Sequence, residues 1–174
     1  MNKFLIPFLI CILTVSCKSP NDPEVLYADW NTKNKDYFKH MKDSSDYMLY
    51  QIPLDRGGHS FYYKILSQGT QSPGNLSDTS WVSINYRGKL ITGFVFDQTY
   101  QGNSVLNDSS ATPQPFRLDV LIKGFAENLK QMKTGEIRRI VLPQELGYGT
   151  YFNNTTIPPY SVTIWDLQLL SNYP

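Results

Sequence analysis

Residues 82–87 alternate between apolar and polar side chains, and no other feature of the sequence constrains the fold as strongly. In the stretch VSINYR every second residue is apolar, which is the period of a β-strand with one buried face. Strand-like runs also occupy residues 61–66, 94–96, 137–142 and 162–170. Thr92-Gly93 predicts a turn before the strand at residues 94–96.

Residues 28–43 have a helical pattern instead. Trp30, Asn34, Phe38 and Met41 recur at spacings of three and four, which is the period of one helix face. The carboxylate of Asp29 is the expected N-cap. We expect this helix to pack on its own domain rather than on a partner.

A second helical segment is short and lies among the strands. It runs from Glu127 to Met132 and is expected to end near Gly135. Residues 98–115 are rich in Asn, Ser, Thr, Gln and Pro, so we expect a long exposed loop there. Many strands, one short central helix and no alternation of strands with helices predict an α+β fold built on an antiparallel sheet.

The N-terminus has the pattern of an export signal. Lys3 precedes an almost unbroken apolar run from Phe4 to Val15, which is shorter than the ~20 residues of a bilayer-spanning helix. Residues 1–16 are therefore predicted to be a signal peptide. The run ends in LTVSC, which resembles a bacterial lipobox, so Cys17 is the predicted lipidation site and residues 17–27 a polar tether. The alternative is an ordinary cleaved signal followed by a stray cysteine.

The cysteine count favours lipidation. The chain has two cysteines, and Cys11 would be lost with the signal peptide. An unmodified Cys17 would leave one unpaired thiol, which is unusual in an exported protein. We therefore expect an envelope lipoprotein at the periplasmic face or outer membrane of a Gram-negative bacterium, attached to the membrane through Cys17.

Charge and composition exclude several classes of function. The formal net charge is +1, and removal of Lys3 with the signal peptide leaves a neutral protein. Nucleic-acid binding needs a basic excess that this chain lacks. Neither His40 nor His59 has a second metal-type ligand at useful spacing, so we expect no metal site and no cofactor. No nucleophile motif or defensible acid–base pair is present, which favours binding, or chemistry that breaks no covalent bond. A monomer is the default expectation.

Five sequence blocks, in order, resemble the family of FKBP-type peptidyl-prolyl cis-trans isomerases. They are VSINYRGKL with GFVFD, LIKGF, the stretch from Leu129 to Gly135, RRIVLP with LGYG, and IPP with VTIWDLQLL. The resemblance covers residues 61–170 and implies an isomerase domain over residues 59–174, preceded by an N-terminal helical extension over 28–58. The leader and Asp29-Trp30-Asn31 also resemble envelope FKBP lipoproteins, including those associated with gliding motility.

The resemblance implies a half-barrel antiparallel sheet wrapped around the short helix, with a proline pocket between helix and sheet. The residues that it places in this pocket are Tyr86, Phe96, Asp97, Phe116, Leu121, Ile122, Phe125, Tyr148, Ile157 and Trp165. Two of them depart from the family pattern. Phe125 replaces the tryptophan expected at the pocket floor, and Trp165 replaces a phenylalanine on the last strand.

The implied activity is the rotation of Xaa-Pro bonds in envelope proteins. The resemblance assigns the pocket floor to Phe125 and the pocket walls to Phe96, Phe116 and Trp165. The Tyr148 hydroxyl would hold a substrate carbonyl. The other implied ligands are proline-containing polypeptides and macrolides of the FK506 type. An alternative is a chaperone or adaptor with the same fold and little or no catalysis.

The remaining implied roles are polar. Asp97 would accept a hydrogen bond from the substrate or from the Tyr86 hydroxyl. Leu121 and Ile122 would offer a backbone edge to the substrate, and Ile157 would contact it.

Overall fold

The computed structural model describes residues 19–70, 75–102, 109–151 and 156–173. The predicted signal peptide and Cys17 lie outside these ranges. None of the helices in the described ranges has the length and hydropathy that crossing a bilayer requires.

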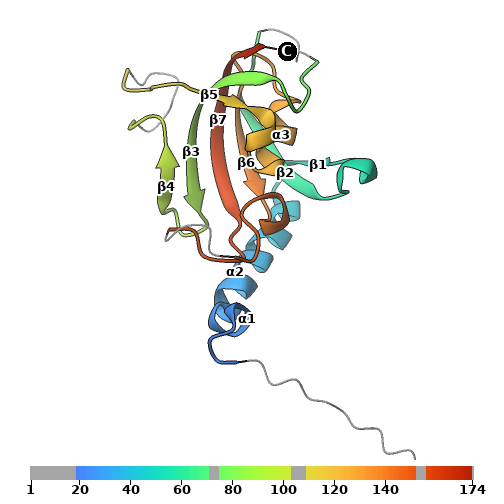
Figure 1. Ribbon diagram of the computed structural model, residues 1–174, viewed down its shortest axis with the longest axis vertical. Coiled ribbons are helices and arrows are strands. Elements are labelled where there is room, and N and C mark those ends of the chain that lie inside the picture. The colour runs from blue at the N-terminus through green and yellow to red at the C-terminus, as the bar shows by residue number, and fades with distance from the viewer. Residues whose placement is uncertain (1–18, 71–74, 103–108, 152–155, 174) are drawn as a thin grey trace, which may run out of the picture.

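The core of the molecule is one seven-stranded antiparallel sheet (Figure 1). Six strands follow the order β1-β2-β6-β7-β3-β4, and β5 pairs with the outer edge of β3 beside β4. The strands are β1 (Met48–Gln51), β2 (Ser60–Ser67), β3 (Trp81–Leu90), β4 (Val95–Gln98), β5 (Gln114–Arg117), β6 (Ile137–Leu142) and β7 (Thr163–Tyr173). The predicted α+β class with an antiparallel sheet and one short central helix is confirmed.

That central helix is α3 (Lys123–Leu129), which lies against one face of the sheet (Figure 1). The prediction of a helix from Glu127 to Met132 is wrong in its bounds, since α3 begins four residues earlier. Gly124 lies within the helix and does not interrupt it. A Cβ at this position would lie 2.5 Å from the Leu142 side chain. The glycine allows the first turn of the helix to approach β6 closely.

Side chains alternate between the two faces of the sheet, as the period of a strand requires. On the α3 side, Ile140, Leu167 and Leu169 pack with Phe125 and other residues of the helix. On the opposite face, Val141, Val162 and Ile164 form a second cluster with Met41. Each face therefore has its own helical cover.

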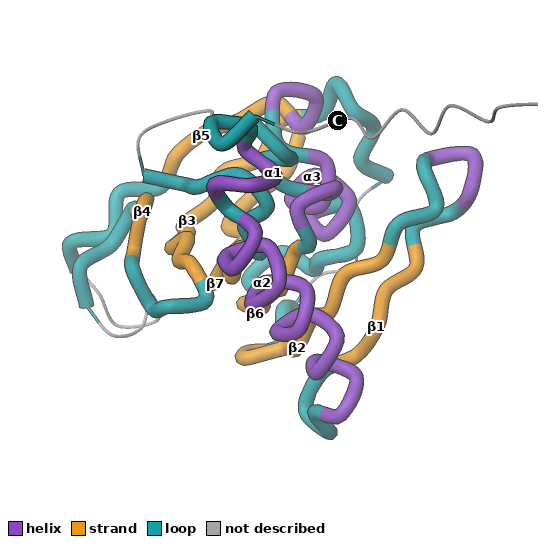
Figure 2. The backbone as a smooth tube through the Cα atoms, turned by 90° about the horizontal axis from the view of Figure 1, so that it is seen from below, coloured by secondary structure: helices purple, strands orange, loops and turns teal. Residues whose placement is uncertain are grey.

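The cover of the second face is α2 (Ala28–His40), which continues into a 3₁₀ turn, η1 (Met41–Asp43). Figure 2 shows α2 beside β2 and β6, and the Phe38 and Tyr62 rings meet there at 5.2 Å between centroids. The predicted helix, packed on its own domain, is confirmed. The capping prediction for Asp29 is wrong, because Tyr27 occupies the N-cap and Asp29 lies in the first turn.

Polar contacts fix the position of α2. Asn34 is 1 % exposed, and its Oδ1 accepts a hydrogen bond from the Val162 N–H at 2.8 Å. The Trp30 indole donates to Ser161 Oγ at 3.0 Å. These two bonds tie the helix to the segment that leads into β7.

Three further segments differ from expectation. The tether contains a helical turn, α1 (Pro23–Leu26), capped by the Asp22 carboxylate. In the range 28–58, α2 and η1 end at Asp43; β1 follows and pairs with β2, and a short 3₁₀ turn, η2 (Leu54–Arg56), comes after it. The expected loop over 98–115 ends in β5, whose Phe116 lies opposite Val82 of β3. Residues 103–108 of that loop lie outside the described ranges.

Candidate functional site

A cavity of about 290 Å³ lies between α3, β3, β7 and the segment that follows β5. We call it the ring-lined cavity. Its lining consists of Tyr86, Asp97, Phe116, Val120, Leu121, Ile122, Phe125, Tyr148 and Trp165. Five of these nine residues are aromatic, so the cavity is apolar over most of its surface.

The base of the cavity is formed by Phe125 of α3 and Trp165 of β7. Both side chains are 3 % exposed, and their rings meet at 90° with 5.0 Å between centroids. Edge-to-face packing of this kind is a favourable arrangement for two aromatic rings. The Trp165 indole N–H donates to Thr163 Oγ1 at 3.0 Å, so the one polar group of the Trp165 side chain needs no hydrogen-bond partner in the cavity.

Gly88 on β3 makes room for this packing. It pairs with Trp165 across the sheet, and a Cβ at Gly88 would lie 2.5 Å from the Trp165 ring and 2.7 Å from the Phe96 ring. The Phe96 ring lies at 86° to Trp165, with 5.0 Å between centroids. Phe96 therefore packs against the Trp165 ring and does not itself line the cavity.

The polar rim contains a hydrogen bond from the Tyr86 hydroxyl to Asp97 Oδ2, at 3.0 Å. Tyr86 stands on β3 and Asp97 on the adjacent strand β4, so sheet pairing brings the two side chains together. Burial raises the pKa of Tyr86, and the charge and hydrogen bond of Asp97 raise it further. The Tyr86 phenol therefore stays protonated and keeps its donor role.

Tyr148 lies in the loop after the 3₁₀ turn η5 (Gln144–Leu146). Gly149 has φ of +74°, a conformation that glycine adopts readily, and its N–H donates to the Gln144 carbonyl at 3.0 Å. The Tyr148 ring packs against Phe96 at 89°, with 6.2 Å between centroids. Burial, and then the charge of Asp97, raise the pKa of Tyr148 to about 12.

The segment before α3 closes the third side of the cavity. The Ile122 carbonyl accepts hydrogen bonds from the N–H groups of Phe125 and Ala126, which fixes the start of the helix. In the part of the chain that the structure describes, no hydrogen bond engages the Ile122 N–H. A bound polypeptide could therefore use this donor.

The structure brings eight of the ten predicted pocket residues to the cavity. Phe96 lies behind the lining, as described above. Ile157 does not line the cavity at all: it is 1 % exposed, so its side chain has no surface to offer to a substrate. Val120 was not predicted, although it lines the cavity and is 66 % exposed. Its one sequence signal is its position directly before Leu121.

The arrangement suits a proline ring better than covalent catalysis. The base is apolar and almost fully buried, while the rim holds two phenols whose raised pKa keeps them protonated at neutral pH. In the described ranges no group of three or more His, Cys, Asp or Glu side chains is placed to hold a metal ion. The geometry can therefore bind an apolar ring, exclude water and hold a carbonyl.

Comparisons with known proteins agree with this geometry. Residues 73–170 match the family described as FKBP-type peptidyl-prolyl cis-trans isomerase. The isomerase FkpA of Escherichia coli is 33 % identical over 153 residues, which cover 84 % of this chain and 48 % of FkpA. A probable FKBP-type isomerase of Haemophilus influenzae is 37 % identical over 112 residues, covering 64 % of this chain and 42 % of the relative. The chain thus spans about half the length of these relatives.

Solved structures show the same fold. The crystal structure of Escherichia coli FkpA has a TM-score of 0.68 and 30 % identity, and the match covers 87 % of this chain and 63 % of that one. An isomerase structure from Pseudomonas syringae has a TM-score of 0.67 at 22 % identity, covering 85 % of this chain and 96 % of that one. Because the family match extends over more than half of the sequence, this chain belongs to the family of FKBP-type peptidyl-prolyl cis-trans isomerases.

Proposed function

We propose that this protein catalyses cis-trans isomerisation of Xaa-Pro bonds in polypeptides of the bacterial envelope. The observation that carries the proposal is the ring-lined cavity, with Phe125 and Trp165 at its base and the Tyr86–Asp97 hydrogen bond at its rim. Membership of the isomerase family supports the reaction.

The physical chemistry of the reaction fits such a cavity. Resonance gives the peptide bond a rotation barrier of about 18–20 kcal/mol, and exchange before proline takes tens to hundreds of seconds. The twisted transition state is less polar than the planar amide, so an apolar site removes water's preference for the planar form. A rate gain of about 10⁴ needs only about 5.4 kcal/mol, and no nucleophile takes part.

Several lining residues then have defined roles. Phe125, with Trp165 beside it at the base, would carry the pyrrolidine ring, and Phe116 would form a wall. The Tyr148 hydroxyl would donate to the carbonyl beside the proline. The Ile122 N–H would hold a second carbonyl and fix the substrate backbone.

The test is a protease-coupled Xaa-Pro peptide assay of the purified chain and the double variant Asp97→Leu, Tyr148→Phe. Loss of two hydrogen-bonding groups, each contributing about 1 kcal/mol, should lower kcat/KM about 10- to 100-fold. Far-UV circular dichroism should stay unchanged. Equal activity of the two proteins would reject the assigned roles, and an inactive parent chain would reject the proposed reaction.

Val120 supports a second candidate function, that of a chaperone or adaptor with little catalysis. Its side chain is 66 % exposed at the rim of the cavity and could hold apolar segments of a client. Suppression of aggregation by a chain that isomerises no Xaa-Pro peptide would favour this alternative. Loss of that suppression in Val120→Ser would assign it to the rim.

We also propose that the protein is a lipoprotein of the envelope, attached through Cys17. One relative, from Legionella longbeachae, is described as an outer membrane protein, and the lipobox-like LTVSC supports a lipid anchor. Membership of the gliding-motility-associated subgroup stays a prediction. In cells fed an alkyne-tagged fatty acid, Cys17→Ser should lose both label and membrane association, while the matched variant Cys11→Ser should keep both. Label on the Cys17→Ser protein would contradict the anchor.

A macrolide titration tests whether the cavity is open. We propose that FK506 enters the ring-lined cavity and changes the fluorescence of Trp165. A Trp30→Phe, Trp81→Phe variant retains Trp165 as its one indole, since the chain has three tryptophans. A saturable change in that variant would support the proposal, and a flat titration would count against it.

A further inference from the structure

A second cavity adjoins the ring-lined cavity and shares Leu121 with it. Its volume is about 370 Å³, and we call it the charged cavity. Besides Leu121, its lining includes Arg56, Asp78, Asp119, Lys123 and Glu127. A polypeptide whose proline occupies the first cavity would pass this one within a few residues, since an extended chain advances ~3.3 Å per residue.

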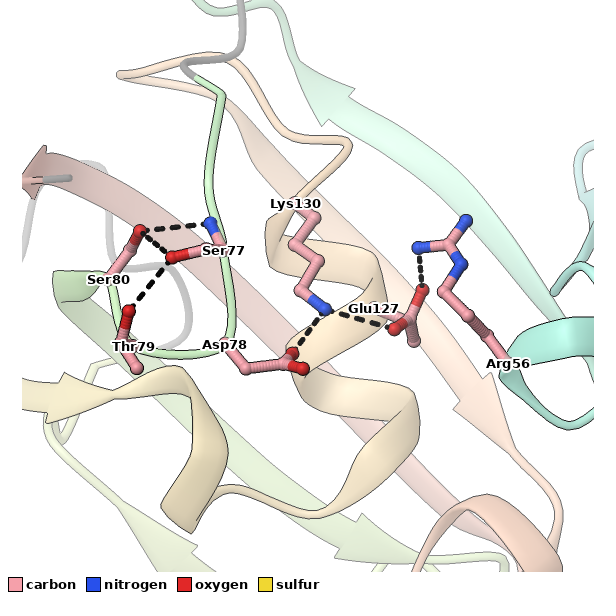
Figure 3. Close-up of polar contacts among 7 residues, drawn as sticks. All are labelled: Arg56, Ser77, Asp78, Thr79, Ser80, Glu127 and Lys130. Carbon is pink, nitrogen blue, oxygen red and sulfur yellow. Dashed lines mark hydrogen bonds and ion pairs between the residues drawn. The ribbon is translucent and has the colours of Figure 1, made fainter.

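The carboxylates that line the charged cavity already have basic partners. Glu127, on α3, accepts hydrogen bonds from Arg56 Nη1 at 2.8 Å and from Lys130 Nζ at 3.1 Å (Figure 3). Lys130 also bonds to Asp78 at 2.6 Å, as Figure 3 shows. Asp119 pairs with the Arg117 Nε at 2.7 Å.

The protonation states agree with this pairing. Burial alone would lower the pKa of Lys130, but its bonds to Asp78 and Glu127 raise that pKa. The hydrogen bond and charge of Lys130 lower the pKa of Asp78. Asp78 is therefore ionised at physiological pH. Because all three carboxylates are paired with basic side chains, they offer little attraction to a further cation.

Lys123 is the exception among the basic residues of this cavity. Its side chain is exposed, and in the described ranges no hydrogen bond or ion pair engages its ammonium group. The ammonium lies over the turn at Gly57, where a Cβ would come within 2.5 Å of it. Lys123 directly follows Ile122, which lines the ring-lined cavity. The unpaired charge of the charged cavity is thus positive, whereas the Asp97 carboxylate at the rim of the ring-lined cavity carries a negative charge and accepts a hydrogen bond from Tyr86.

We infer that the charged cavity is a substrate subsite that favours an acidic side chain, Asp or Glu, near the proline of the client polypeptide, with Lys123 as the residue that selects it. The inference rests on the proposed function, because it assumes that a client occupies the ring-lined cavity. It adds a substrate preference that the apolar cavity cannot supply.

The test uses Xaa-Pro peptides that carry Glu, Gln or Lys at one flanking position at a time. Isomerisation is followed without a coupling protease, and binding is followed by fluorescence anisotropy of labelled peptides. An exposed ion pair predicts that, at one flanking position, the Glu peptide exceeds the Lys peptide about two- to fivefold in both measurements. Salt at about 1 M, where the Debye length is about 3 Å, should abolish the difference.

Charge reversal at Lys123 gives the decisive comparison. In both measurements, Lys123→Glu should invert the ratio of the value for the Glu peptide to the value for the Lys peptide. Lys123→Gln should bring that ratio close to one. The matched control Lys42→Glu changes another exposed lysine, which does not line either cavity, and should keep the parent ratio. The salt series on the unmodified chain tests, without any variant, whether the preference is electrostatic.

The outcomes separate the two proposals. Isomerisation of all peptides at equal rates, with equal binding, would overturn the acidic subsite and leave the isomerase proposal standing. Binding that favours the Glu peptide, without isomerisation of any peptide, would support the acidic subsite and overturn the isomerase proposal. An unchanged ratio in Lys123→Glu would overturn the role of Lys123, and absence of both catalysis and charge preference would overturn both proposals.

Discussion

Phe125 and Trp165 meet at right angles at the base of the ring-lined cavity, in the positions where the family pattern has Trp and Phe. The exchange keeps one indole and one phenyl ring in the same space. The indole is tightly packed at Gly88, because the Trp165 and Phe96 rings fill the volume where a Cβ would lie. The two positions should therefore be energetically coupled.

A double-mutant cycle tests this coupling. Phe125→Trp alone should overpack the base and lower the free energy of unfolding by about 1–3 kcal/mol. Trp165→Phe alone should leave a void and lower it by a similar amount, about 1–3 kcal/mol. The double variant should recover part of the loss, with an interaction energy of about 0.5–3 kcal/mol by urea unfolding. Strictly additive losses would show that the two rings pack independently.

The two phenols predict how activity depends on pH. Tyr148 has a pKa of about 12 and that of Tyr86 is also raised, so neither hydroxyl loses its proton near the ordinary tyrosine value of about 10. A raised pKa preserves the neutral donor as pH increases. We expect kcat/KM to stay level between about pH 6 and about pH 10. A decline centred near the ordinary tyrosine pKa, in a chain still folded by circular dichroism, would contradict the donor roles.

Among the elements, α2 shows how one buried side chain can hold a helix in place. The Asn34 amide accepts the Val162 N–H and donates to the Trp30 carbonyl at 2.7 Å. Asn34→Ala should leave the Val162 N–H buried without a partner and cost about 1–3 kcal/mol. The neighbouring Lys35→Ala changes an exposed position and should alter stability by less than about 0.5 kcal/mol. Thermal unfolding compares them, and equal melting temperatures would show that Asn34 is dispensable.

The elements also show which sequence signals suffice to predict a strand. Strands β2, β3, β6 and β7 were predicted because their apolar residues alternate or run continuously. Strand β1 was missed because most of its side chains are exposed, so Met48–Gln51 lacks a buried face to create a pattern. β5 was missed because Pro115 suggested a loop, although a proline is tolerated on a strand at the edge of a sheet.

The site was partly predictable, because the alternation of apolar residues also places side chains on one face of a strand. Strand periodicity aligns Val82, Ile84 and Tyr86 on one face, but only the family resemblance marks Tyr86 as a pocket residue. No sequence rule distinguishes the exposed rim residue Val120 from the buried Ile157, because both are branched apolar residues outside the strands and the α-helices. Their roles depend on how distant segments close over the helix, which a local pattern does not encode.

At the scale of the whole molecule, the two N-terminal helices, α1 and α2, differ in their importance to the fold. The α2–η1 segment covers an apolar cluster that includes Val141, Val162 and Ile164, whereas α1 has no buried residue. The N-terminal segment is therefore part of the folded unit only from α2 onward.

Two truncations test this boundary. Deleting residues 19–43 should uncover the cluster, increase binding of a hydrophobic dye and lower the melting temperature by on the order of 10 °C. Deleting only residues 19–26 removes α1 and should change neither. A melting temperature that is unaffected by the longer deletion would place the boundary after Asp43 instead.

The hydrogen bonds of the segment before β7 have a mechanical consequence. The Tyr160 N–H donates to the Gly149 carbonyl at 3.0 Å, and the next two residues along the chain, Ser161 and Val162, hold Trp30 and Asn34 of α2. A tensile force applied at the N-terminal end would reach this segment through α2. It would therefore strain the backbone one residue away from Tyr148. Because Tyr148 lines the ring-lined cavity, tension at the N-terminal end would act on the shape of that cavity.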